Sequence, residues 1–231
     1  MKKLFFGILV AGSITFPMQA SAGSLGNNLG FNIVEVTETA VRKNADKILT
    51  ELWKSAVLME ESKICIAEAL EMNPREIAAS KEILQAMIFD HKDLNAIRRS
   101  INHQFLESEM QEKIAELMTI TDQTKLDQLT KLLQRSKDVR SLARHYSSYV
   151  TGRFSNAIGH LAVMNEMNPA EEDRIAGYFF SQIEDSDEML KYQVKQMKIF
   201  DQTFNAIEKK LNIETPSRKE LKQIEREILP E

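Results

Sequence analysis

The sequence predicts an all-α protein, an elongated antiparallel bundle of about four long helices plus a short C-terminal helix, after a cleaved signal peptide. Three observations support this fold class. Apolar residues recur in steps of three and four along extended segments, only 8 Gly and 5 Pro occur in 231 residues, and two copies of Glu-Met-Asn-Pro-x-Glu separate the segments. Each amphipathic segment must cover its apolar stripe, and short joints favour antiparallel neighbours.

Residues 1–22 have the pattern of a secretory signal peptide. Lys2 and Lys3 precede an apolar stretch over 4–16, and Ala20-Ser21-Ala22 supplies a small-x-small cleavage site. We expect cleavage after Ala22 and a periplasmic or secreted protein with no stable transmembrane anchor after cleavage. The apolar stretch is shorter than the roughly 20 residues that a spanning helix needs.

Residues 23–32 are predicted to form a flexible leader, and residues 33–212 the helical bundle domain. A first helix extends to about Met72. A second begins at Pro74, capped by Asn73, and continues past Leu117, because Asn is a good N-cap and Pro fits a first helical turn.

After a turn over 119–124, a third helix is predicted to continue as far as the second copy of the motif, at 166–171. A fourth helix follows, with a possible break at 184–187, and residues 213–231 form a short C-terminal helix and tail. The repeated motif is interpreted as two uses of one capping solution, and internal duplication stays open as the alternative.

Charge and cysteine content exclude some classes of protein. Removing the signal peptide takes away two lysines and leaves 28 Lys and Arg against 34 Asp and Glu, which argues against binding of nucleic acid. Cys65 is the only cysteine, so no internal disulfide can form. Its apolar neighbours predict a buried, inert thiol, with an intermolecular bridge as the alternative.

Motifs for catalysis are missing from the sequence. The four histidines lack the Glu-x-x-His pattern of di-iron bundles, and neither Cys-x-x-Cys-His nor His-Glu-x-x-His occurs. We therefore predict no catalytic residues, no cofactor and no enzymatic activity.

A candidate metal motif consists of His160, Met164 and Met167, because spacings of four and three place an imidazole and two thioethers on one helical face. Soft sulfur ligands favour copper(I). The favoured interpretation is that the two methionines fill the core, since Met is a common gap filler.

A row of mostly small residues on the third helix is the most suggestive feature. Its members alternate in steps of four and three, and they are Ser141, His145, Ser148, Gly152, Ser155, Gly159 and Ala162. Helical glycines each cost about 1 kcal/mol relative to Ala, so a close contact should offset them. Internal packing is the favoured account. The alternative is a partner or ligand groove with Tyr146, Tyr149 and Arg153 at its rim.

These observations predict an exported, non-enzymatic protein that acts by protein–protein interaction. An assembly factor, a chaperone-like binder or an accessory component of an envelope or secretion apparatus would fit. The expected partner is another envelope or secreted protein, and a homo-oligomer is possible. The alternative is a periplasmic bundle that binds a small ligand or copper.

Overall fold

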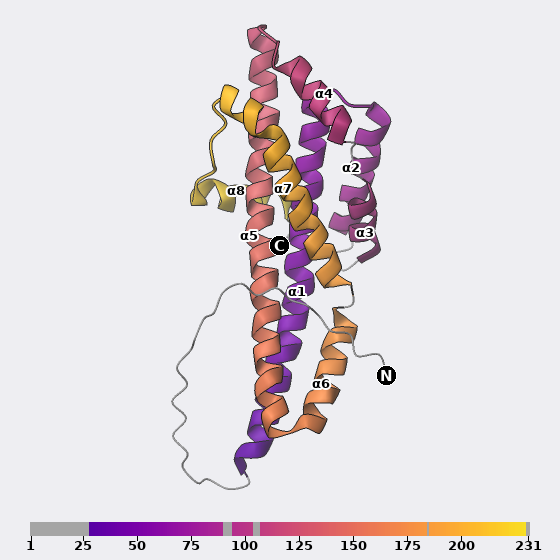
Figure 1. Ribbon diagram of the computed structural model, residues 1–231, viewed down its shortest axis with the longest axis vertical. Coiled ribbons are helices and arrows are strands. Elements are labelled where there is room, and N and C mark those ends of the chain that lie inside the picture. The colour runs from indigo at the N-terminus through magenta and orange to yellow at the C-terminus, as the bar shows by residue number, and fades with distance from the viewer. Residues whose placement is uncertain (1–27, 90–93, 104–106, 184, 230–231) are drawn as a thin grey trace.

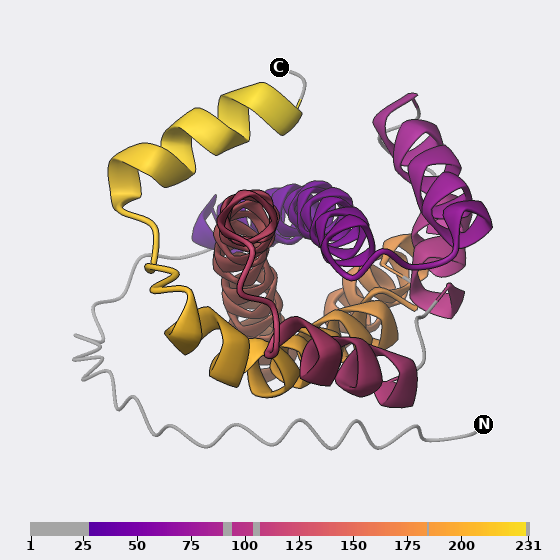
Figure 2. The same ribbon diagram turned by 90° about the horizontal axis from the view of Figure 1, so that it is seen from above.

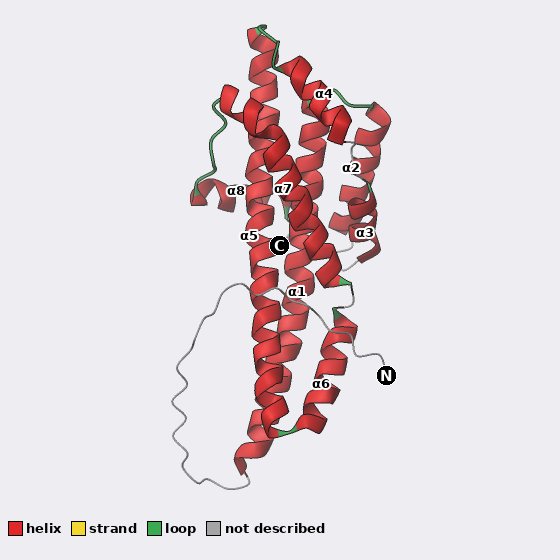
Figure 3. Cartoon of the chain, in the orientation of Figure 1, coloured by secondary structure: helices red, strands yellow, loops and turns green. Residues whose placement is uncertain are grey.

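The computed structural model describes residues 28–89, 94–103, 107–183 and 185–229, which are helical throughout apart from short joints and contain no strand (Figure 3). The predicted signal peptide lies outside the described residues. The helices are α1 (Asn28–Ala69), α2 (Pro74–Phe89), α3 (Leu94–Asn102), α4 (Glu107–Leu117), α5 (Gln123–Met167), α6 (Pro169–Gln182), α7 (Ser186–Lys210) and α8 (Arg218–Ile228).

Helices α1 and α5, of 42 and 45 residues, run antiparallel along the length of the molecule (Figure 1). Serine hydroxyls meet across their contact: Ser55 and Ser147 Oγ atoms are 2.8 Å apart, as are those of Ser62 and Ser136. Small side chains let the two backbones approach, and each pair leaves no hydroxyl unsatisfied in the core. This contact is the centre of the bundle.

Helices α6 and α7 together form a third column that packs against both α1 and α5 (Figures 1 and 2). Asn168 caps α6 by accepting a hydrogen bond from the Glu171 amide at 3.4 Å, and Asn73 similarly accepts one from the Arg75 amide at 3.0 Å. Helices therefore begin at Pro169 and Pro74 as predicted. The predicted break also occurs, with Asp185 in the left-handed region at φ 63°.

The prediction of one long helix from Pro74 past Leu117 is wrong, because α2, α3 and α4 occupy this region as three short helices. Side chains of α1 bind the ends of two of them. The Trp53 indole donates to the Met87 carbonyl at 2.7 Å, and Lys63 Nζ donates to the carbonyls of Ser100 at 2.8 Å and His103 at 3.0 Å. Helix-terminal carbonyls lack partners within their own helix, so these bonds favour ends there.

Helix α8 lies across α5 on the outside of the bundle (Figure 2). The helix begins at a capping box formed by Ser217 and Glu220, and the Ile224 side chain on its inner side is buried. At the other terminus, α1 begins at Asn28, inside the segment 23–32 that the sequence predicts as a leader. None of the described helices combines the length and apolar character that crossing a membrane requires.

Candidate functional site

The row of small residues on α5 points away from the bundle. Ser148, Gly152, Ser155, Gly159 and Ala162 are all exposed, whereas Ala157 and Leu161 on the opposite side of the helix are buried. We call the exposed side the α5 outer face and define it by eight exposed residues. They are Ser148, Tyr149, Gly152, Ser155, Asn156, Gly159, Ala162 and Val163.

The favoured interpretation of this row, internal packing, is wrong. No atom of the described neighbouring residues lies within 4 Å of a Cβ added at Gly152 or Gly159. The contact with α1 uses a different small-residue row, which includes Ser136, Ala143 and Ser147. A signal for this arrangement exists in α1, where Ser55 and Ser62 stand seven residues apart, two helical turns, on the side that meets α5.

The α5 outer face carries no charged side chain. Between Arg144 and Glu166, Arg153 is the only charged residue, counting His as neutral, and it is half-buried beside the face. Charged residues make up 28% of the whole chain. A solvated helix face normally carries many charged residues. The α5 outer face, over residues 148–163, is about 23 Å long at 1.5 Å per residue and carries none. Depletion of charge is a property that this face shares with the core of protein interfaces.

Helix α8 lies at the N-terminal end of this face, beside Tyr146. Tyr146, predicted as a rim residue, is buried instead, and its hydroxyl donates to the Glu225 carboxylate of α8. Lys54 Nζ lies 4.9 Å from the centre of the Tyr146 ring and 4.0 Å from Glu225 Oε1. Burial, followed by the bond to Glu225, raises the pKa of Tyr146, so this hydroxyl stays protonated and anchors α8.

Two exposed aromatic rings lie beside this anchor. The His145 and Tyr149 rings are 4.4 Å apart between centroids, and Tyr149 is 45% exposed. Nearby Glu51 on α1 has a raised pKa because burial disfavours its charged form, an effect that Lys54 and Arg153 partly oppose. The N-terminal end of the face therefore carries aromatic and polar side chains, and its centre carries small, uncharged ones.

The three residues of the predicted copper motif occupy different environments. His160 is half-buried, Met164 is 1% exposed within the core, and Met167 is 52% exposed. Methionine aside, no three His, Cys, Asp or Glu side chains gather as a metal site within the described residues.

A buried polar cluster lies between α1 and α3. It contains a lysine, a glutamate and a serine, residue types that act as catalytic groups in other proteins. Lys63 Nζ lies 2.5 Å from Glu60 Oε2, and the Ser100 hydroxyl donates to the same carboxylate. Burial is the main reason that the pKa of Lys63 is lowered. Lys63 and Glu60 are only 1% and 0% exposed, so no substrate can reach them in this conformation. The cluster fixes the end of α3.

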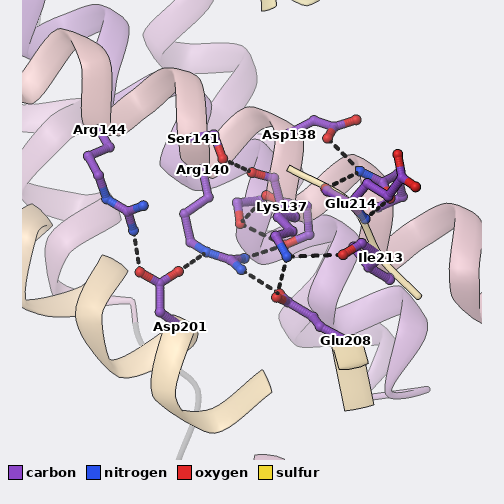
Figure 4. A network of polar contacts seen from close by, with 12 residues as sticks. Lys137, Asp138, Arg140, Ser141, Arg144, Asp201, Glu208, Ile213 and Glu214 are labelled. Atoms are coloured by element: carbon purple, nitrogen blue, oxygen red, sulfur yellow. Dashed lines mark hydrogen bonds and ion pairs between the residues drawn. The ribbon is translucent and has the colours of Figure 1, made fainter. Parts of the chain in front are cut away.

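A second charged cluster joins α5 to α7 (Figure 4). The buried Arg140 guanidinium donates from Nε to Asp201 at 2.9 Å and from Nη2 to Glu208 at 2.7 Å. Lys137 Nζ also reaches Glu208 at 3.0 Å. Each of these four charges has an opposite partner, so the cluster forms an ion-pair network that joins α5 to α7.

Cys65 is buried and unpaired in the described structure, as the sequence predicts. Burial, with a smaller contribution from Glu61, raises the pKa of its thiol to about 12. Because the thiolate is the reactive form, this thiol is inert at neutral pH.

Comparison with known proteins gives no match: no family model, no curated protein and no solved structure matches the chain.

Proposed function

We propose that this chain is an exported, non-enzymatic helical protein that acts by protein–protein interaction through the α5 outer face. The expected location is the periplasm or the medium, and the expected role is that of an assembly factor, a chaperone-like binder or an accessory envelope component. The proposal rests on one observation. The α5 outer face carries no charged side chain, and no described atom lies close to an added Cβ at Gly152 or Gly159.

Helix energetics support this use of the face. Each helical glycine costs about 1 kcal/mol relative to Ala, and nothing in the described molecule contacts either position closely. Glycine at such a position does allow another backbone to approach closely. A docked helix would therefore recover, in the complex, stability that the free chain lacks.

The Gly152→Leu variant tests the proposal. We expect it to lose at least tenfold in affinity for the envelope partner, measured by quantitative co-purification from cells that produce the protein. Its own stability should rise by about 0.8 kcal/mol in urea unfolding, because Leu is a better helix former and a Cβ added at this position meets no neighbour.

Gly177→Leu is the matched control. Gly177 lies in α6 and is equally open, with no described atom within 4 Å of an added Cβ. It should gain similar stability and keep the partner. Unchanged capture by Gly152→Leu, or equal losses in both variants, would contradict the proposal.

Copper binding stays the alternative. It has less support, because Met164 lies in the core whereas Met167 is exposed and His160 is half-buried.

A further inference from the structure

We infer that the α5 outer face pairs with the same face of a second copy of this chain, in an antiparallel, two-fold symmetric dimer. The inference rests on the proposed function, since it names the partner of the proposed surface. Closed two-fold pairs are the commonest protein oligomers, and their interfaces must be self-complementary. The α5 outer face meets this requirement in three respects.

The glycines set the register. Two helices approach most closely where both lack side chains, so Gly152 of one copy should lie opposite Gly159 of the other. In an antiparallel pair this places the two-fold axis between Ser155 and Asn156. The contact then extends symmetrically from this axis along the bare part of α5.

The same register also pairs large side chains with small ones. Tyr149, 45% exposed, lies opposite Ala162, and Val163, also 45% exposed, lies opposite Ser148. Each large side chain therefore meets a small one, and symmetry repeats each pair. Such alternation of large and small residues is what lets facing helices interdigitate.

Charge distinguishes the two orientations of the pair. The antiparallel register places Glu166 opposite His145 and one residue from Arg144, whose guanidinium also binds Asp201. All three residues are exposed. A parallel pairing in register would instead place Glu166 against Glu166, so charge favours the antiparallel arrangement.

The length of the contact sets the expected strength. From His145 to Glu166 a pair of helices extends about 30 Å at 1.5 Å per residue. Such a pair buries on the order of 1,000 Å², at the lower limit for a specific interface. We therefore expect a dimer with a dissociation constant in the micromolar range, measurable by sedimentation of the purified protein from about 1 to 500 µM.

Cysteine crosslinking tests the register. Under mild oxidation, Ser155→Cys and Asn156→Cys should each form disulfide-linked dimers, because both lie beside the axis. Ala162→Cys alone should not, but mixed with Tyr149→Cys it should give a mixed dimer. Cys65 is buried, with a pKa of about 12, and does not compete.

Charge reversal tests the ends of the face independently. Glu166→Lys should weaken the dimer about fivefold, and adding His145→Glu should restore it. Both residues are exposed, so folding should be unaffected. Failure of the second substitution to restore the dimer would contradict this register.

The outcomes separate this inference from the proposed function. A wild-type chain that stays monomeric at 500 µM, while Gly152→Leu still loses another envelope protein, overturns the dimer and leaves the proposed function standing. Crosslinking of Ala162→Cys with itself also overturns it. Dimers that link at Ser155 and dissociate on Gly152→Leu substitution support the inference, whether or not a further protein binds.

Discussion

Replacing Lys63 with methionine should lower the free energy of unfolding by about 3–5 kcal/mol, as expected when one member of a buried ion pair is removed. The variant leaves the Glu60 carboxylate, 0% exposed, without its counter-charge. It also frees the Ser100 and His103 carbonyls that end α3. Urea unfolding followed by circular dichroism at 222 nm measures the change.

Two further variants identify the cause. Lys81→Met removes an exposed ion pair with Glu68 and should cost less than about 1 kcal/mol. Adding Glu60→Gln to Lys63→Met should recover at least about 1 kcal/mol, because the unpaired carboxylate disappears. If Lys63→Met and Lys81→Met cost the same, the described burial of Lys63 is wrong.

Replacing Arg140 with methionine should cost about 3 kcal/mol. Arg140 is 2% exposed and binds both Asp201 and Glu208, so its removal leaves Glu208, itself mostly buried, with Lys137 as its remaining cation (Figure 4). Since Asp201 and Glu208 belong to α7, the variant should also increase amide hydrogen exchange in α7 more than in α1.

Arg144→Met provides the control for this prediction. Arg144 shares the Asp201 carboxylate but is 54% exposed, so its loss should cost less than about 1 kcal/mol. Equal effects of the two substitutions would show that burial does not distinguish the two arginines.

The helix starts could be predicted from the sequence because their causes are local. Asn73 and Asn168 bind amides two or three residues away, and the proline that follows each fits a first turn. The division of the 74–117 region could not, because it depends on Trp53 and Lys63, which lie far away in the sequence. The spacing of apolar residues along the chain does not indicate hydrogen bonds between residues that are far apart in the sequence.

The direction of the small-residue row could not be read from its spacing either. α5 has two rows of small residues, one with Ser136 and Ser147 buried against α1, the other with Gly152 and Gly159 exposed. Both rows are compatible with close helix packing, and only the position of α1 decides between them. Asn156 and Val163 are also exposed on this side of α5 but lie beside the row of small residues, so the spacing of that row does not assign them to the face.

We propose that this protein binds other proteins at the α5 outer face. Site-specific photo-crosslinking in cells is the most direct test. A photoreactive phenylalanine derivative replaces Tyr149, 45% exposed on that face, or Phe180, 42% exposed on α6, which serves as the matched control. Illumination should give a discrete higher-mass adduct from position 149 and none from position 180. No adduct from 149, or the same adduct from both positions, would contradict the claim.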